Sequence, residues 1–178
     1  MILKPEYFAT NETVELAYNL IGKYLVRNIN NQISKYMITE VEAYHGISDK
    51  ASHARFGKTP RNSLMFAEFG YCYVYLCYGI HWLLNIVTGQ KDFPAAILIR
   101  GVNNVYGPGK VSKLLQIDNS YNGKHLDINN KIWVEDLGIK ITNIEKLPRI
   151  GINYAQEYKD KLWRFRYIDT KSKTRNNF

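Results

Sequence analysis

The first third of the chain changes from a helical to a strand-like pattern of apolar residues. Over residues 10–21 apolar side chains recur three to four positions apart, which predicts a short helix capped by Thr10 or Asn11. Tyr24–Arg27 and Ile33–Tyr44 have the composition of strands, and the NINN segment between them is typical of a turn. We therefore expect a helix followed by an antiparallel pair of strands.

The rest of the chain alternates irregular segments with short strands. Residues 51–69 have no apolar period and mix Gly, Pro and cations, as in a long functional loop. YCYVYLCYGIHWLLNIVTG predicts a hairpin that turns at Tyr78-Gly79 and has Tyr71, Tyr73 and Tyr75 on one face. Strands are also expected at 95–102, 131–136 and 163–168, and a helix at 107–118. The predicted fold is α+β: a single domain with a curved antiparallel β-sheet, a protruding β-hairpin and surrounding helices.

The length and charge of the chain limit the possible number of domains and the kinds of partner. A chain of 178 residues with 46% hydrophobic content fits one domain, which we place at residues 1–170, with a flexible basic tail at 171–178. The net charge is +8, and residues 140–178 contain ten basic and four acidic residues. This balance suggests a polyanionic partner or a solvated basic face. No signal peptide or membrane span is recognisable, so we expect a cytoplasmic protein.

Two carboxylates lie on one face of the strand within ITEVEAYHG. Glu40 and Glu42 would be roughly 7 Å apart by strand geometry, and Tyr44 would follow them on the same face. Neighbouring carboxylates raise each other's proton affinity, so either could act as a general base. The local pattern alone favours the alternative of an exposed, charged strand edge. Periodicity does not distinguish the two glutamates.

The long loop contains candidate polar contacts. His53 could bind a metal with Glu42 and His45, but no metal-binding spacing supports this, and a hydrogen-bonding histidine is the commoner case. Three cations of the loop, Arg55, Lys58 and Arg61, would suit phosphate contacts, with ordinary solvation as the alternative.

Tyr78 falls at the expected hairpin turn, where its ring would project from the tip. An exposed aromatic tip on a basic protein can insert between stacked bases, whereas a ring folded back onto the hairpin would only pack.

GPGK lacks the first glycine and the Ser/Thr of a phosphate-binding loop. The segment is still expected to begin a helix, and this helix N-terminus with Lys110 and Lys113 nearby would be a modest site for a backbone phosphate.

Several segments occur in an order that resembles one known family. They are TEVEAYHG, DKASHARFGKTPRNSLMF, YVYLCYGIHWLLNIV, AAILIRGV, GPGKVSKLLQ and PRIGINYAQEY…WRFRY. Together they resemble the 3-methyladenine DNA glycosylase family of the alkyladenine type, over roughly residues 4–167. The resemblance implies a monofunctional base-excision repair enzyme that flips a damaged purine from duplex DNA, hydrolyses the N-glycosidic bond and leaves an abasic site. Lesions of the 3-methyladenine, hypoxanthine and ethenoadenine type are the implied substrates.

The same resemblance assigns roles to individual residues. Glu42 becomes the general base that activates water, which Arg100 and the backbone carbonyl of Ile150 hold, while Glu40 receives no role. The flipped base would lie between Tyr44 on one side and His53 with Tyr75 on the other. Asn85 would crowd the exocyclic amine of normal guanine, and Tyr78 would fill the gap left in the duplex.

The resemblance implies no metal and no organic cofactor, and we expect a monomer associated with the nucleoid through its DNA substrate. A rival hypothesis is a non-catalytic module that binds damaged DNA. A second rival is a glycosylase with lyase activity, which would need an amine to form a Schiff base; the sequence singles out no such lysine.

Overall fold

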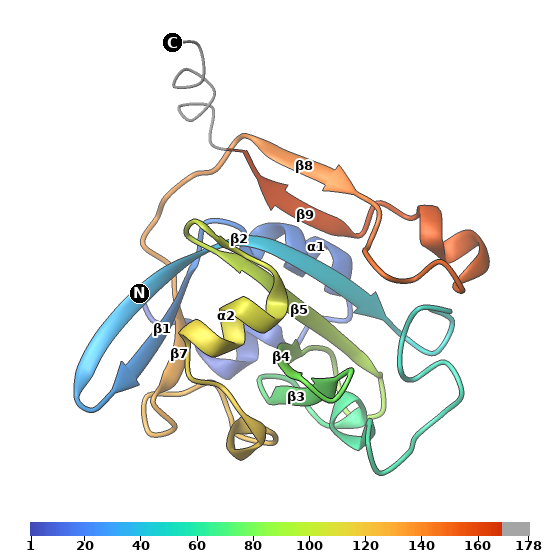
Figure 1. The fold of residues 1–178 in the computed structure, drawn as a ribbon, viewed down its shortest axis with the longest axis horizontal. Helices are drawn as coiled ribbons and strands as arrows, with labels where there is room; N and C mark the ends of the chain where they lie inside the picture. Colours follow the sequence, from blue (N-terminus) through green and yellow to red (C-terminus); the bar gives the residue numbers. More distant parts are fainter. Residues whose placement is uncertain (169–178) are drawn as a thin grey trace.

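Strand β2 (Gln32–His45) runs through the centre of the fold and joins its two halves (Figure 1). Its first half pairs with β1 (Tyr24–Ile29), and its second half pairs with β5 (Ala95–Val102) and β9 (Arg164–Tyr167). The main strand order is β3-β4-β5-β2-β1-β7, and every pairing is antiparallel. This computed structural model describes residues 1–168, and the basic tail predicted at 171–178 lies outside them.

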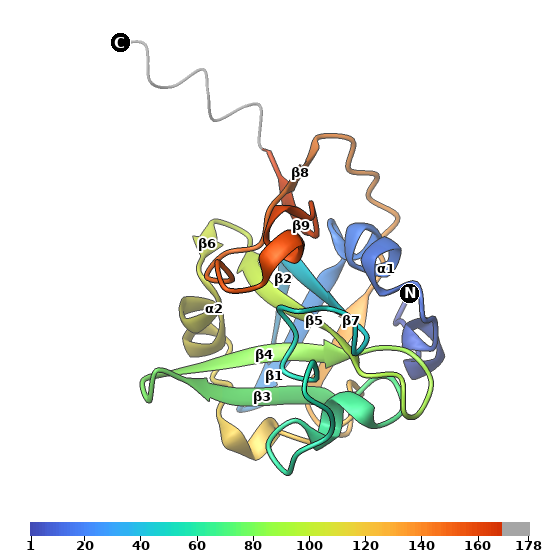
Figure 2. The same ribbon diagram turned by 90° about the vertical axis from the view of Figure 1, so that its right-hand side faces the viewer.

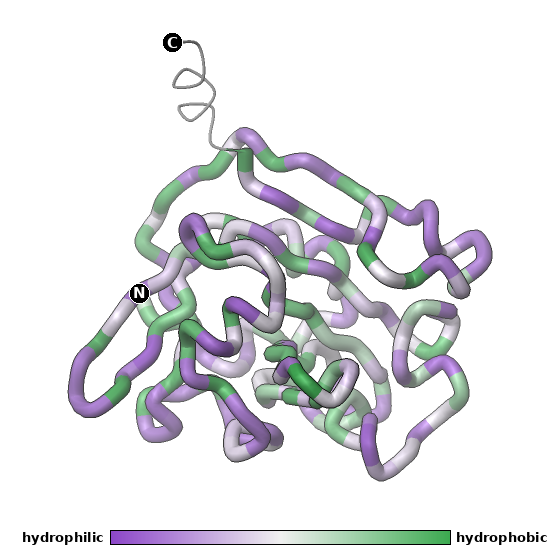
Figure 3. Tube along the Cα trace, in the orientation of Figure 1, coloured by the Kyte–Doolittle hydropathy of each residue, from purple (hydrophilic) through white to green (hydrophobic). Residues whose placement is uncertain are grey.

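The β1–β2 hairpin shows why the NINN segment turns. Ile29 pairs with Gln32, so the loop contains only Asn30 and Asn31, with φ angles of 50° and 65°. Two residues with positive φ form a type I′ turn, whose twist matches the flanking strands, and asparagine tolerates this conformation better than most residues. The predicted turn is confirmed, and its hydrophilic tip projects at the lower left of Figure 3.

The first helix is shorter than its sequence pattern suggests. Helix α1 covers Thr13–Leu20, and Glu12 occupies the N-cap position. Thr10 and Asn11 were expected to cap it, and this is wrong: Thr10 Oγ1 accepts from the Glu12 amide at 3.0 Å, and Asn11 Oδ1 accepts from the Gln90 amide at 3.1 Å. Both side chains therefore fix the approach to the helix, which packs against β2.

Strands β3 (Cys72–Cys77) and β4 (His81–Val87) form the predicted hairpin, which projects from the body of the protein (Figure 2). The Ile80 amide donates to the Cys77 carbonyl at 3.1 Å and closes the turn. The two central residues, Tyr78 and Gly79, have φ angles of 51° and 69°. The hairpin tip is therefore a type I′ turn with a tyrosine where asparagine or glycine is usual.

The second helix lies against β4 and reaches the end of this strand that is next to the hairpin turn. Helix α2 (Pro108–Leu114) follows the short strand β6 (Val105–Tyr106), and Gly107 is its N-cap. A Cβ atom on Gly109 would lie 2.8 Å from the His81 ring, so glycine is needed for this close approach of α2 to β4. The GPGK segment thus has a packing role in the fold.

Strands β7 (Ile132–Glu135) and β8 (Ile144–Leu147) complete a nine-stranded open sheet among the described residues. The α+β prediction is confirmed, as are the strands at 131–136 and 163–168. Strands β6 and β8 were not predicted, because the first has two residues and the second is a polar edge partner of β9. Short 3₁₀ helices occur at Pro5–Phe8, Ser63–Phe66, Asn119–Tyr121 and Gln156–Asp160.

The main hydrophobic core lies between the sheet and the two helices and includes Leu20, Ile38, Ile99 and Leu115. A second, smaller cluster places the irregular segment 51–69 against the hairpin through Ala54, Met65 and Phe66, with Tyr71, Tyr73 and Tyr75 on the hairpin side. The predicted tyrosine face is confirmed. No helix among residues 1–168 is long and apolar enough to cross a membrane.

Candidate active site

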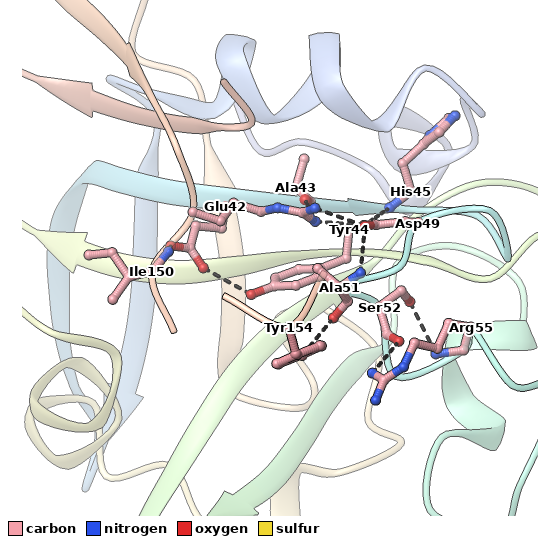
Figure 4. Close-up of polar contacts among 12 residues, drawn as sticks. Glu42, Ala43, Tyr44, His45, Asp49, Ala51, Ser52, Arg55, Ile150 and Tyr154 are labelled. Carbon is pink, nitrogen blue, oxygen red and sulfur yellow. Dashed lines mark hydrogen bonds and ion pairs between the residues drawn. The ribbon is translucent and has the colours of Figure 1, made fainter. Parts of the chain in front are cut away.

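Glu42 is at the centre of the candidate site and its side chain is completely buried. The Tyr44 hydroxyl donates to its Oε2 at 2.9 Å, and the Ile150 amide donates to its Oε1 at 2.8 Å (Figure 4). Strand β2 positions Glu42 and Tyr44, whereas Ile150 comes from the segment between β8 and β9. Two elements far apart in sequence therefore fix the orientation of one carboxylate.

Arg100 lies between the two glutamates of β2. Its Nε is 3.4 Å from Glu42 Oε1 and 3.5 Å from Glu40 Oε1, and Arg164 donates to Glu40 at 2.8 Å. Glu40 is only 5% exposed. The interpretation of the pair as an exposed strand edge is wrong, because arginines from β5 and β9 neutralise both carboxylates inside the fold.

The environment of Glu42 makes its ionised form less favourable than that of a free carboxyl. Burial raises the pKa of this carboxyl, and it outweighs the opposing effects of the Arg100 charge, the Ile150 amide, the Tyr44 hydroxyl and the Arg149 charge. A carboxyl with a raised pKa that still keeps oriented hydrogen bonds has the properties of a general base. This combination is typical of functional sites.

Glu42 is part of the wall of a cavity of about 550 Å³, a volume within the usual range for small-molecule sites. Its walls come from strands β2, β3, β4 and β5, the hairpin turn, the 51–69 segment, the start of α2 and residues 150–154. It brings together most of the residues predicted as site residues: Glu42, Tyr44, His53, Arg61, Tyr75, Tyr78, Asn85, Arg100 and Ile150.

Aromatic rings line two sides of this cavity. Tyr44 contributes from β2, and His53 and Tyr75 come from the loop and β3, with ring centroids 4.6 Å apart in an edge-on arrangement. His53 Nδ1 is 3.0 Å from the Tyr73 hydroxyl. Partial burial and the charges of Arg61 and Arg55 lower the pKa of His53, so a neutral imidazole is favoured at neutral pH.

Asn85 is buried and lines the cavity, and its orientation is fixed by the strand next to it. Its Nδ2 donates to the Tyr73 carbonyl at 3.1 Å across the β3–β4 pair. Since the amide cannot rotate without losing this bond, the cavity wall at this point is rigid.

The predicted DNA-contacting residues differ in how close they lie to the cavity. Tyr78, at the hairpin tip, is 90% exposed, so its ring does not fold back onto the hairpin. Arg61 lines the cavity and donates to the Leu76 carbonyl at 3.2 Å. Lys58, Lys110 and Lys113 are exposed and lie outside the cavity lining.

One buried ion pair at the site was not predicted. Arg149 donates to both carboxylate oxygens of Asp49 at 2.6 and 2.8 Å, and both side chains are fully buried. Arg149 also donates to the carbonyl of Ala43. Figure 4 labels Ala43 together with its neighbours in sequence, Glu42 and Tyr44. The partners are 100 residues apart in sequence, so local patterns contained no signal for the pair.

Metal ligands do not gather at this site. Within residues 1–168 no three His, Cys, Asp or Glu side chains are placed to hold a metal ion. The polar groups around Glu42 are instead two hydrogen-bond donors and a guanidinium.

Comparison with known proteins gives a consistent match. The model of the methylpurine-DNA glycosylase family matches residues 7–106 and 103–171. Three curated relatives are each named "Putative 3-methyladenine DNA glycosylase". The protein from Rickettsia felis is 42% identical over 95% of both chains. That from Borrelia garinii subsp. bavariensis is 40% identical over 93% of this chain and 96% of its own. That from Ehrlichia ruminantium is 38% identical over 96% and 95% respectively.

These matches cover the strands, the loop and the hairpin that build the cavity, and each relative is spanned almost completely. The chain therefore belongs to the methylpurine-DNA glycosylase family.

Proposed function

We propose that this protein is a monofunctional DNA glycosylase that removes alkylated or deaminated purines from duplex DNA. The observation that carries the proposal is a buried, hydrogen-bonded Glu42 in the wall of a cavity that aromatic rings also line. The family membership and the names of the relatives agree with it.

The proposed reaction needs one base and one water. The Glu42 carboxylate takes a proton from water, the water oxygen bonds to C1′ of the sugar, and the C1′–N bond breaks with its electron pair moving to the purine. A cationic alkylated purine leaves as a neutral base, so it needs little acid assistance. The ionised carboxylate also stabilises the positive charge that develops on the sugar.

Arg100 is proposed to orient this water together with the Ile150 carbonyl. The buried Nε of Arg100 makes no hydrogen bond within residues 1–168, although it lies near two carboxylates. A buried donor without a partner is costly, so a water at this position would satisfy it. The Ile150 amide donates to Glu42, so the backbone of Ile150 lies next to the proposed base, which supports a role for its carbonyl in holding the reacting water.

Base recognition is assigned to the cavity walls. We propose that the purine stacks on Tyr44 and contacts His53 and Tyr75 on the opposite side. Rings of this kind favour cationic, electron-poor bases by cation–π attraction. The fixed amide of Asn85 is proposed to disfavour normal guanine by crowding its exocyclic amine.

Tyr78 and the cations are proposed to bind the duplex. The exposed ring at the hairpin tip would enter the space left by the flipped nucleotide, which compensates for lost stacking. Arg61, Lys58, Lys110 and Lys113 would contact phosphates around it.

The direct test compares wild type with Glu42→Gln for release of 3-methyladenine from alkylated DNA. Glutamine keeps the shape and an acceptor for the Ile150 amide but is not a base, so we expect release to fall about 10²–10⁴-fold. Comparable release by both proteins would remove Glu42 from the mechanism.

Two controls separate the rival functions. A non-catalytic module would bind a duplex with an abasic-site mimic yet release no base from any single-lesion duplex. A lyase would form a covalent protein–DNA adduct that borohydride traps, and we expect none.

A further inference from the structure

The buried pair of Arg149 and Asp49 lies directly behind the wall of the cavity. Both side chains have no exposure to solvent, and two short hydrogen bonds join them. Asp49 also accepts from the amides of His45 and Ala51 at 3.1 and 3.0 Å. The pair therefore has one fixed position relative to strand β2.

The guanidinium of Arg149 is sandwiched between two aromatic rings. Its Cζ is 4.8 Å from the centroid of Tyr44 and 5.0 Å from that of Trp163. Tyr44 lines the cavity, whereas Arg149 and Trp163 do not. The guanidinium consequently lies on the side of the Tyr44 ring that faces away from the cavity.

A cation behind the ring affects what binds in front of it. A base stacked on the cavity side of Tyr44 would lie about 3.5–4 Å from the ring, so its charge would be roughly 8 Å from that of Arg149. Two cations on opposite faces compete for the same ring electrons and repel each other. An uncompensated Arg149 would therefore weaken binding of a cationic purine and affect a neutral purine much less.

We propose that Asp49 is a specificity-determining positioning residue, which neutralises Arg149 behind Tyr44 and so keeps the front face of this ring attractive to cationic purines. The proposal rests on the proposed function, because it concerns which purine the same cavity prefers. It assigns a role in base selection to two side chains that do not touch the base.

The test measures single-turnover base release from two duplexes of identical sequence. One contains 7-methylguanine, which is cationic, and the other contains hypoxanthine, which is neutral. Base release by wild type is measured first, and release of neither base would refute the proposed function. For Asp49→Asn we expect the ratio of the two rate constants, cationic over neutral, to fall about tenfold.

The direction in which the ratio of rate constants changes distinguishes the charge effect from a general disordering of the site. A disordered cavity would slow hypoxanthine release at least as much as 7-methylguanine release, because the neutral base is the poorer leaving group. A ratio for Asp49→Asn that is unchanged or higher than in wild type would overturn the proposal.

The matched control is the double variant Asp49→Asn with Arg149→Met, which removes both charges. Its ratio is expected within about twofold of wild type, even if both rates are lower, since no charge remains behind the ring. Breaking one side of a buried pair is strongly destabilising, so the melting temperature of each variant is measured first. If Asp49→Asn does not fold, the double variant decides: a ratio changed tenfold there would overturn the proposal.

Discussion

Tyr78 combines an unfavourable backbone conformation with an exposed ring, and its replacement should separate stability from DNA binding. Its φ of 51° lies in the left-handed region, and the residue is 90% exposed. A left-handed conformation costs a non-glycine residue about 1–2 kcal/mol, and glycine avoids this cost but loses more backbone entropy on folding. We therefore expect Tyr78→Gly to leave the free energy of unfolding unchanged or to increase it by up to about 1 kcal/mol.

For a chain of this size, about 1 kcal/mol corresponds to a rise of about 2–4 °C in melting temperature. DNA binding should change in the opposite direction. An aromatic side chain stacked on a base contributes about 1–3 kcal/mol, so Tyr78→Gly should weaken binding to a lesion-containing duplex about 5- to 150-fold. Base release under subsaturating conditions should fall in parallel.

Two variants complete the experiment. Tyr78→Ala also removes the ring but keeps the left-handed strain, so it should bind as weakly as Tyr78→Gly and melt at or slightly below the wild-type temperature. Tyr78→Phe keeps the ring and should bind like wild type. Thermal melting and fluorescence anisotropy with labelled duplexes are the assays. Unchanged binding by Tyr78→Ala together with a clearly lower melting temperature would show that the residue only packs.

Four further predictions concern the site and its surroundings. Glu42→Gln should melt at a higher temperature than wild type at neutral pH, because burial raises the pKa of Glu42 and the fold disfavours its charge. Because the folded-state pKa of Glu42 is raised, its protonation stabilises folded wild type at acidic pH, and this stabilisation is lost as pH rises through that pKa. The difference in melting temperature between the two proteins should therefore be smaller at about pH 5 than at neutral pH. Melting curves at these two pH values check this. The single-turnover rate of wild type should rise as pH passes the raised pKa of Glu42, and a rate that shows no rise at any pH above the ordinary carboxyl pKa of 4.5 would contradict a general-base role. Glu40→Gln should keep most base release, since glutamine still accepts from Arg164, and a loss as large as that of Glu42→Gln would mean that the two carboxylates were assigned wrongly. Arg61→Gln and Lys58→Gln should each reduce the slope of log affinity against log salt by about 0.9, as measured by titration of duplex binding, if each contacts a phosphate.

The parts of the fold that local sequence determines were predictable. The hairpin turn at Asn30-Asn31 was predictable because asparagine tolerates positive φ, and the turn at Tyr78-Gly79 because its second residue is glycine. Strand β5 matches its expected range because its apolar run is short and bounded on both sides. Strand β8 was missed because its IEKL sequence gains strand structure only from pairing with β9.

The environment of the site depends on contacts that no local pattern contains. Periodicity placed Glu40 and Glu42 on one strand face but favoured solvent exposure, because it could not show that Arg100 and Arg164 would neutralise them. The Asp49–Arg149 pair also joins distant segments. The roles of the cavity residues came from resemblance to a family, and the structure adds the distances on which their tests depend.

The central position of β2 has a consequence for biosynthesis. This strand pairs with β1 directly before it, with β5 some sixty residues later, and with β9 near the end of the described chain. Glu40 pairs in register with Arg166, and Glu42 with Arg164. Pairings this distant in sequence form late, because a long loop must close first. A nascent chain emerges from its N-terminus, so the pocket around Glu42 is completed only after β9 has left the ribosome. Incomplete chains should therefore lack a finished site for damaged bases.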